Sequence, residues 1–284
     1  MSQEKQALLT RIAEALERLA PPPAPAPRFD QARLFRFEPA RREGVADGFI
    51  PAPDYGLAID LLMGVERQKG QFMENLSRFA AGLASNHALL WGARGAGKSS
   101  MAKAAFMAAG QACPALRMIE IDRDDIAALP RLFEDLRGRP ERFVVLCDDL
   151  SFEEGAAAAK SLKSALEGGV AGPPGNVLFV ATSNRRHLMP RSHDEKGDPM
   201  ASAEDAEEQV SVSDRFGLWI GFPPMDQAAY LAAIDAYADR FDLRTENLER
   251  RALQWAQRRG SRSGRVAWQF IRDLAGELKK PLPM

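Results

Sequence analysis

The chain has 284 residues, and its 38 basic and 39 acidic side chains leave a formal net charge of −1. The near-neutral balance excludes a generally basic nucleic-acid coat protein and a generally acidic, solvated chain. No apolar run reaches the length of a membrane span, and the charged N-terminus lacks the apolar centre of a signal peptide. The two cysteines, Cys113 and Cys147, lie in or beside apolar segments, which predicts reduced thiols in a cytoplasmic protein.

The N-terminus predicts a short amphipathic helix within residues 1–20, followed by a proline-rich linker over residues 21–48. Apolar side chains recur at helical spacing at Leu8, Leu9, Ile12, Leu16 and Leu19. The prolines from Pro21 to Pro27 end the helix, because proline cannot continue one and favours an extended spacer. Two interpretations of the helix stay open: a flexible appendage, or an element that docks on a partner or sister subunit.

Short apolar segments then alternate with helical segments through residues 49–224. The apolar segments are His87–Trp91, Leu116–Ile121, Phe143–Cys147, Val177–Ala181 and Leu218–Phe222, and the helical segments are about Gly97–Gly110, Asp124–Arg137 and Gly155–Glu167. This alternation is typical of an α/β core, and we expect a five-stranded parallel sheet buried on both faces. Residues 225–284 then predict a small helical domain, with helices at Met225–Arg240, Glu246–Arg259 and Gly264–Lys279.

Residues 191–213 interrupt this pattern with seven acidic and two basic side chains. A segment this long without periodicity is usually functional or disordered. We expect a flexible acidic loop in the absence of a partner.

A P-loop motif is the strongest functional signal. Its residues are Gly92, Ala93, Arg94, Gly95, Ala96, Gly97, Lys98 and Ser99, with Ser100 following. The motif lies between a predicted strand and a predicted helix, where backbone N–H groups and the helix N-terminus bind phosphate oxygens. Lys98 is expected to reach the β- and γ-phosphates, and Ser99 to bind Mg²⁺.

Two acids follow the buried segment Phe143–Cys147, as in a Walker B motif. We expect Asp148 to hold Mg²⁺ and Asp149 to polarise the attacking water as a general base. The alternative is a pair of solvated acids that cap the next helix.

Val177–Ala181 is also followed by small polar residues, Thr182, Ser183 and Asn184, and here the chain resembles the AAA+ ATPases. The resemblance implies that Asn184 is the sensor-1 residue and orients the lytic water. It also implies an arginine finger at Arg215, within Ser213–Gly217, that acts across a subunit boundary. Arg265, at the start of the last helix, matches sensor 2, and Val65, in the turn before the P-loop, matches an adenine contact.

The combined motifs resemble more closely a bacterial family of AAA+ ATPases catalogued as domain of unknown function 815. The resemblance rests on GVERQK, Asn75–Phe79, LLWGARGAGKSS, CDDLSFEE, ATSNRRHL, SVSDRFGL and RSGRVAWQF, and covers roughly residues 49–278. It implies an AAA+ fold and ATP binding, and supplies no substrate. Most AAA+ ATPases have Glu where this chain has Asp149, and the shorter side chain predicts slow hydrolysis.

We therefore expect an AAA+ ATPase that uses ATP and Mg²⁺ and couples hydrolysis to a conformational change of itself or a macromolecular partner. The resemblance implies a homo-oligomer, and we favour a protein partner over nucleic acid and expect no membrane partner. A basic cluster keeps nucleic acid open: Arg250, Arg251, Arg258, Arg259, Arg262 and Arg265. Two other functions stay open, a nucleotide-gated binding module that scarcely hydrolyses ATP and a P-loop kinase for a small molecule.

Overall fold

The computed structural model describes residues 3–19, 27–40, 47–150, 156–167, 172–184 and 214–282, so the acidic segment 191–213 lies outside the described residues. The strands are β1 (Leu34–Glu38), β2 (Gly48–Ala52), β3 (Ala88–Gly92), β4 (Leu116–Ile121), β5 (Arg142–Cys147), β6 (Val177–Ser183) and β7 (Leu218–Phe222). The helices are α1 (Gln3–Leu19), η1 (Ile59–Leu61), α2 (Glu66–Ala80), α3 (Lys98–Ala109), η2 (Arg123–Ala128), α4 (Leu129–Leu136), α5 (Ala156–Glu167), α7 (Gln227–Arg240), α8 (Leu248–Arg259) and α9 (Gly264–Glu277).

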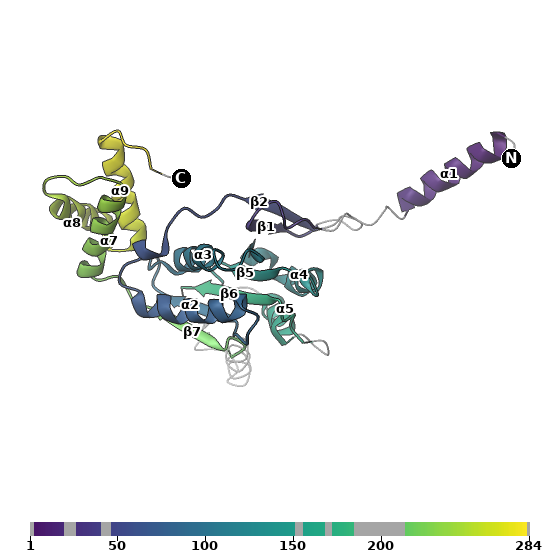
Figure 1. Ribbon diagram of the computed structural model, residues 1–284, viewed down its shortest axis with the longest axis horizontal. Helices are drawn as coiled ribbons and strands as arrows, with labels where there is room; N and C mark the ends of the chain where they lie inside the picture. Colours follow the sequence, from purple (N-terminus) through teal and green to yellow (C-terminus); the bar gives the residue numbers. More distant parts are fainter. Residues whose placement is uncertain are drawn as a thin grey trace, which may run out of the picture.

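The strands form one sheet in the order β2-β1-β4-β5-β6-β3-β7, as Figure 1 shows. The five strands expected from the sequence pair in parallel, with β3 between β6 and β7. The expected number of five strands is wrong, because the sheet has seven strands in the described residues alone. β1 joins it parallel to β4, and β2 pairs with β1 in the antiparallel direction.

Strand β1 also corrects the expected linker over residues 21–48. Phe35 and Phe37 are each 1% exposed, whereas Arg36 and Glu38 between and after them are exposed. This alternation is typical of a strand near the edge of a sheet. The α/β domain therefore begins before residue 49, since Leu34–Glu38 is part of its sheet.

Helices cover both faces of the sheet because successive strand residues bury their side chains on opposite sides. In β5, Phe143, Val145 and Cys147 pack in the core beneath η2, α4 and α5. Val144 and Leu146 pack in a second core beneath α2 and α3. Predicted helix Asp124–Arg137 is divided in the structure into a 3₁₀ segment, η2, and the α-helix α4.

The last three helices of the described chain pack around a separate core. Tyr230 and Ile234 of α7 pack against Phe270 and Ile271 of α9. Tyr230 Oη donates a hydrogen bond of 3.1 Å to the carbonyl oxygen of Ala252 in α8. These helices lie at one end of the sheet (Figure 1), and we refer to α7, α8 and α9 together as the lid.

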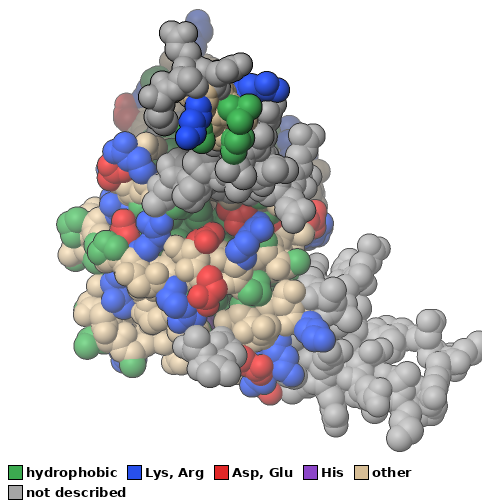
Figure 2. All heavy atoms as spheres, turned by 90° about the vertical axis from the view of Figure 1, so that its right-hand side faces the viewer, with side chains coloured by type: hydrophobic (Ala, Val, Ile, Leu, Met, Phe, Trp, Pro, Cys, Tyr) green, Lys and Arg blue, Asp and Glu red, His purple; other side chains and the backbone are tan. Residues whose placement is uncertain are grey.

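Helix α1 carries Leu8, Leu9 and Ile12 with 57%, 50% and 47% of their surface exposed. Neither interpretation of this helix is tested by the exposure alone. On the face shown in Figure 2, basic and acidic side chains are interspersed, in keeping with the near-zero net charge. Within the described ranges, none of the helices combines the length and apolar character that crossing a membrane requires.

Candidate functional site

The parallel topology brings three predicted segments to the same edge of the sheet. The P-loop follows β3, Asp148 and Asp149 follow β5, and Asn184 follows β6. β6 pairs with both β3 and β5, so these three carboxyl ends are neighbours. Ligands of open α/β sheets bind in the crevice outside these ends.

A cavity of about 910 Å³ lies at this edge, between the sheet and the lid. The predicted site residues that line it are Arg94, Gly95, Gly97, Lys98, Ser99, Ser100, Asp148, Asp149, Asn184 and Arg265. The residues that the sequence analysis grouped by motif are therefore brought together around one space.

The glycines of the P-loop serve different purposes. Gly92 has φ of 135°, and a Cβ there would lie 2.1 Å from the carbonyl oxygen of Phe222, so Gly92 allows the loop to leave β3 beside β7. Gly97 has φ of 92° and caps α3, where a left-handed conformation favours glycine. Gly92, Ala93 and Ala96 do not line the cavity, and Ala96 is buried in the core.

Lys98 is a buried cation at the floor of the cavity, with 7% of its surface exposed. Its Nζ donates hydrogen bonds of 2.9 Å to the carbonyl oxygens of Gly92 and Ala93, and one of 3.0 Å to Asn184 Oδ1. Burial lowers the pKa of Lys98, and the nearby carboxylates of Asp148 and Asp149 oppose that shift. A buried ammonium group whose hydrogen bonds go to neutral oxygens fits an anionic ligand.

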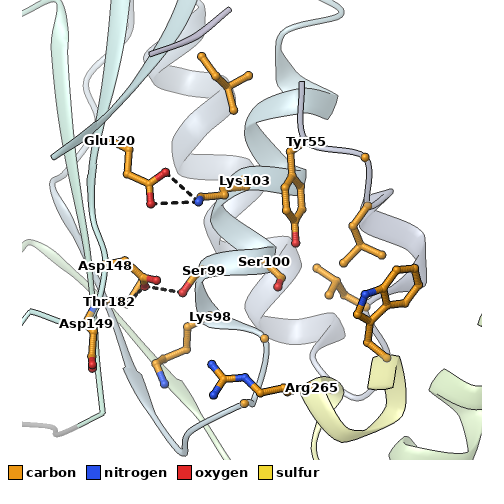
Figure 3. Close-up of a pocket in the computed structure, with 18 of the residues that line it drawn as sticks. Tyr55, Lys98, Ser99, Ser100, Lys103, Glu120, Asp148, Asp149, Thr182 and Arg265 are labelled. Carbon is orange, nitrogen blue, oxygen red and sulfur yellow. Dashed lines mark hydrogen bonds and ion pairs between the residues drawn. The ribbon is translucent and has the colours of Figure 1, made fainter. Parts of the chain in front are cut away.

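The Ser99 hydroxyl donates a hydrogen bond to Asp148 Oδ1, and the Thr182 hydroxyl donates to the same oxygen. Figure 3 shows Ser99 and Asp148 facing each other across the groove between α3 and the strand ends. A hydroxyl and a carboxylate are oxygen ligands of the kind that Mg²⁺ prefers, and Thr182 orients the carboxylate. The residues present therefore fit a magnesium ion.

Asp149 has a left-handed backbone, with φ of 52°, which is uncommon for a residue other than glycine. Thr182 holds it there: its Oγ1 accepts a 3.0 Å hydrogen bond from Asp149 N, and its carbonyl oxygen accepts a 2.7 Å bond from Leu150 N. Asn184 Nδ2 donates to the Asp149 carboxylate. Asn184 thus connects Lys98 and Asp149, and the Asp149 carboxylate lines the cavity.

The lid contributes Arg265 from the first turn of α9, and Figure 3 shows its side chain extending toward Lys98. Ser263 caps this helix by accepting a 3.3 Å hydrogen bond from Val266 N. The amide of Gly264 donates to the carbonyl oxygen of Gly95. The lid therefore contacts the P-loop directly.

Outside the P-loop, Val65 and Arg215 are the predicted residues that do not line the cavity. Val65 is 6% exposed and packs in the core with α2 and α3, so the structure does not place it in the cavity wall. Gly64, with φ of 75°, turns the chain between Val65 and Leu62, and Leu62 lines the cavity instead. Arg215 precedes β7, forms an ion pair with Glu167 and is absent from the cavity wall.

One end of the cavity is aromatic, and the sequence analysis missed it. Tyr55 lines it together with Tyr237 of α7, Phe241 directly after α7, and Trp268 of α9. The Trp268 ring lies 5.3 Å from that of Tyr237 and 5.8 Å from that of Phe241. Burial raises the pKa of Tyr237 to about 12, with a smaller contribution from Tyr55. The four-residue spacing of Tyr237 and Phe241 was a signal for a shared helix face, but their meeting with Tyr55 depends on tertiary packing.

A family model described as "Protein of unknown function (DUF815)" matches residues 30–278. No match was found among curated proteins. The solved structures that resemble the chain include the Orc1 protein of Aeropyrum pernix in complex with DNA, at 16% identity and a TM-score of 0.57. This match covers 80% of the present chain and 61% of the Orc1 chain, which is less than two thirds of the Orc1 length. Another is the RuvB Holliday junction branch migration motor of Thermotoga maritima, at 17% identity and a TM-score of 0.54, covering 80% of this chain and 67% of RuvB. The likeness shows an α/β P-loop fold of the AAA+ type.

Proposed function

The chain belongs to the DUF815 family, and we propose that it is an ATPase that binds ATP with Mg²⁺ and hydrolyses it. One observation carries the proposal: buried Lys98 is connected through Asn184 to Asp149, at the floor of the cavity. A cation for phosphate and a carboxylate for water are thereby held by one amide side chain. This combination serves phosphoryl transfer to water.

Each residue has a proposed role. P-loop N–H groups and Lys98 bind the phosphates, and Ser99 and Asp148 hold Mg²⁺, which neutralises phosphate charge when bound. Asp149 accepts the proton of the attacking water, and Asn184 orients that water and the Asp149 carboxylate. The aromatic end with Tyr55 and Trp268 accommodates the base, since aromatic faces stack on planar rings.

The proposed output is a movement of the lid relative to the sheet. Arg265 and the contact between Gly264 and Gly95 connect the lid to the phosphate-binding loop, so phosphate occupancy can bias the lid position. The motion acts on a macromolecular partner within a homo-oligomer, and a protein partner is favoured. The Orc1 structure contains DNA and RuvB acts on Holliday junctions, so nucleic acid belongs in the same binding assays.

Arg215 is proposed as a finger acting on a neighbouring subunit. β3 and β7 are parallel, with Ala88 opposite Leu218 and Gly92 opposite Phe222. Arg215 therefore lies at the edge opposite the P-loop, and the four intervening steps of strand span about 13 Å. Its own phosphate site is at the far end of that strand pair.

The primary test is Lys98→Ala, titrated with a fluorescent ATP analogue. Loss of a charge-assisted phosphate contact is expected to weaken binding by about tenfold or more. Lys160→Ala, on the exposed surface of α5 and outside the cavity wall, is the matched control and should bind as the unmodified chain does. Equal affinities of the Lys98 and Lys160 variants would contradict the proposal.

The alternatives are separated by turnover measurements. A nucleotide-gated module would bind ATP and show no single-turnover hydrolysis. A small-molecule kinase would consume ATP only when an acceptor is added.

A further inference from the structure

Arg94 is the P-loop residue whose type the motif does not require. Arg94 is the third residue of the motif, and the variable positions on either side of it, Ala93 and Ala96, carry small side chains. Arg94 is exposed and lines the cavity. In the part of the chain that the structure describes, no carboxylate forms an ion pair with its guanidinium.

The position of Arg94 is fixed by its neighbour. The carbonyl oxygen of Gly95 accepts a 3.0 Å hydrogen bond from Gly264 N, and a Cβ at Gly95 would lie 2.9 Å from Ser263 Oγ. The loop is therefore held from the lid side directly after Arg94. A side chain on a held loop loses less entropy when it binds a ligand.

Arg94 belongs to the phosphate half of the cavity. Its charge acts on Lys98, as does that of Arg265, and both lower the pKa of the Lys98 ammonium group. Figure 3 shows Lys98 and Asp149 on one side of the α3 N-terminus and Tyr55 on the other, so the charged and aromatic parts of the cavity are separated by that helix. Arg94 lines the cavity from the same loop whose Gly92 and Ala93 carbonyl oxygens accept hydrogen bonds from Lys98.

The negative charge of the nucleotide phosphates leaves room for a further cation in the cavity. Asp148 and Asp149 are the two acids that follow β5, and a divalent metal would offset their charge, whereas Glu120 of β4 is paired with Lys103. A nucleoside triphosphate carries one more phosphate than a diphosphate, and the planar guanidinium group binds phosphate oxygens in a bidentate way. Lys98 and Arg265 also line the cavity, and two of the Lys98 hydrogen bonds go to the loop carbonyls. A triphosphate has enough oxygens for a third cation.

We propose that Arg94 binds the γ-phosphate of the nucleotide within its own chain, so that a single subunit distinguishes a triphosphate from a diphosphate. This inference rests on the proposed function. It differs from the role of Arg215, which requires a second subunit.

The test compares dissociation constants for ADP and for adenylyl imidodiphosphate, a non-hydrolysable triphosphate, in the full chain with Mg²⁺. Arg94→Ala should raise the triphosphate Kd by about tenfold or more and change the ADP Kd less than about twofold, because only the γ-phosphate contact is lost. Arg94→Lys should give an intermediate triphosphate Kd, because lysine keeps the positive charge but lacks the planar guanidinium group that binds two oxygens at once. Arg258→Ala, exposed on α8 outside the cavity wall, should leave both constants unchanged.

The measurements are repeated at two protein concentrations tenfold apart, and the effect of Arg94→Ala should be the same at both. Unchanged ADP affinity shows that the variant is folded. The inference would be wrong if Arg94→Ala changed both dissociation constants equally, changed neither, or had an effect only at high protein concentration. None of these results would contradict the proposal that the chain binds ATP. If the unmodified chain binds neither nucleotide, both the proposed ATPase function and the role of Arg94 are wrong.

Discussion

The backbone amide of Gly264 donates a hydrogen bond of 3.0 Å to the carbonyl oxygen of Gly95, which joins the first residue of α9 to the P-loop. The two residues are far apart in sequence, and one belongs to the lid and the other to the loop after β3. Since a nucleotide's phosphates are expected to contact the same loop, this hydrogen bond is a backbone link between the proposed phosphate site and the lid, beside the Arg265 side chain in the cavity wall.

Gly95→Ala should interrupt that link. Gly95 has φ of 74°, and the new Cβ would lie 2.9 Å from the side chain of Ser263, so the lid must move away. Gly138→Ala is the matched control: its φ is 71°, and a Cβ there has no neighbour within 4 Å. Each substitution should cost about 1 kcal/mol of unfolding free energy through backbone strain alone. Only Gly95→Ala should also weaken ATP-analogue binding, by about tenfold. Urea unfolding and nucleotide titration measure the two effects, and identical behaviour of the variants would show that the lid contact is unimportant.

Asp149→Asn should separate binding from hydrolysis. Asn is tolerated at positive φ and can still accept the hydrogen bond from Asn184, so the local structure should persist. An amide cannot accept the proton of the attacking water, and loss of a general base typically lowers turnover by about 10²–10⁴-fold. ATP turnover and analogue affinity should be measured on the same preparation. Unchanged turnover would exclude Asp149 as the base.

Arg215→Ala and Lys98→Ala should each be inactive alone and regain activity when mixed, because one supplies an intact phosphate site and the other an intact finger. Arginine fingers typically contribute about 10³–10⁵ in rate. Glu167→Gln is the control, since it removes the ion-pair partner and keeps the arginine. Specific activity that does not change on dilution, with no recovery in the mixture, would leave Arg215 as a structural ion pair.

His87 predicts a loss of stability at acid pH. Its Nδ1 accepts a 3.0 Å hydrogen bond from Phe179 N, and burial lowers its pKa from 6.5 to about 4. The unfolded chain binds a proton below pH 6.5 whereas the folded chain does not until about pH 4, so stability should fall as the pH drops between these values. The full effect is about 3 kcal/mol at 1.36 kcal/mol per pKa unit.

His87→Asn keeps an acceptor near the position of Nδ1 and has no proton to bind. Its unfolding free energy, measured by urea denaturation from pH 7 to pH 4, should decline less steeply than that of the unmodified chain. Parallel curves would mean that other groups cause the acid sensitivity.

The sequence could predict which residues meet in the charged half of the cavity because local patterns specify them. The P-loop lies within eight consecutive residues, and Asp148, Asp149 and Asn184 each follow an apolar strand, so parallel pairing brings them together. The aromatic half of the cavity could not be predicted from the sequence, because Tyr55 and Trp268 come together only through the packing of the lid. Val65 was assigned by resemblance, and the turn at Gly64 directs the neighbouring Leu62 to the cavity instead.

The missed strands have a different cause. β1 lies next to the edge strand β2 and has a period-two pattern in Phe35 and Phe37, with the exposed residues Arg36 and Glu38, so it has no continuous apolar run. Its position after a proline-rich stretch favoured a linker. β2 is short and contains Pro51, which sequence reasoning takes as a sign against a strand, although an edge position tolerates it.

The location of Arg215 at the edge opposite the P-loop restricts the symmetry of an active assembly. In a two-fold dimer, both phosphate sites would have to face both fingers across one shared patch, and surfaces at opposite edges of a sheet do not form one patch. If Arg215 acts on a neighbouring subunit, as proposed, the contact that supplies it is therefore head-to-tail, and repeating that contact would yield either a closed ring or an open spiral. In a spiral, one terminal subunit would hold a nucleotide that no finger reaches, so that ring closure would raise the number of active sites by one.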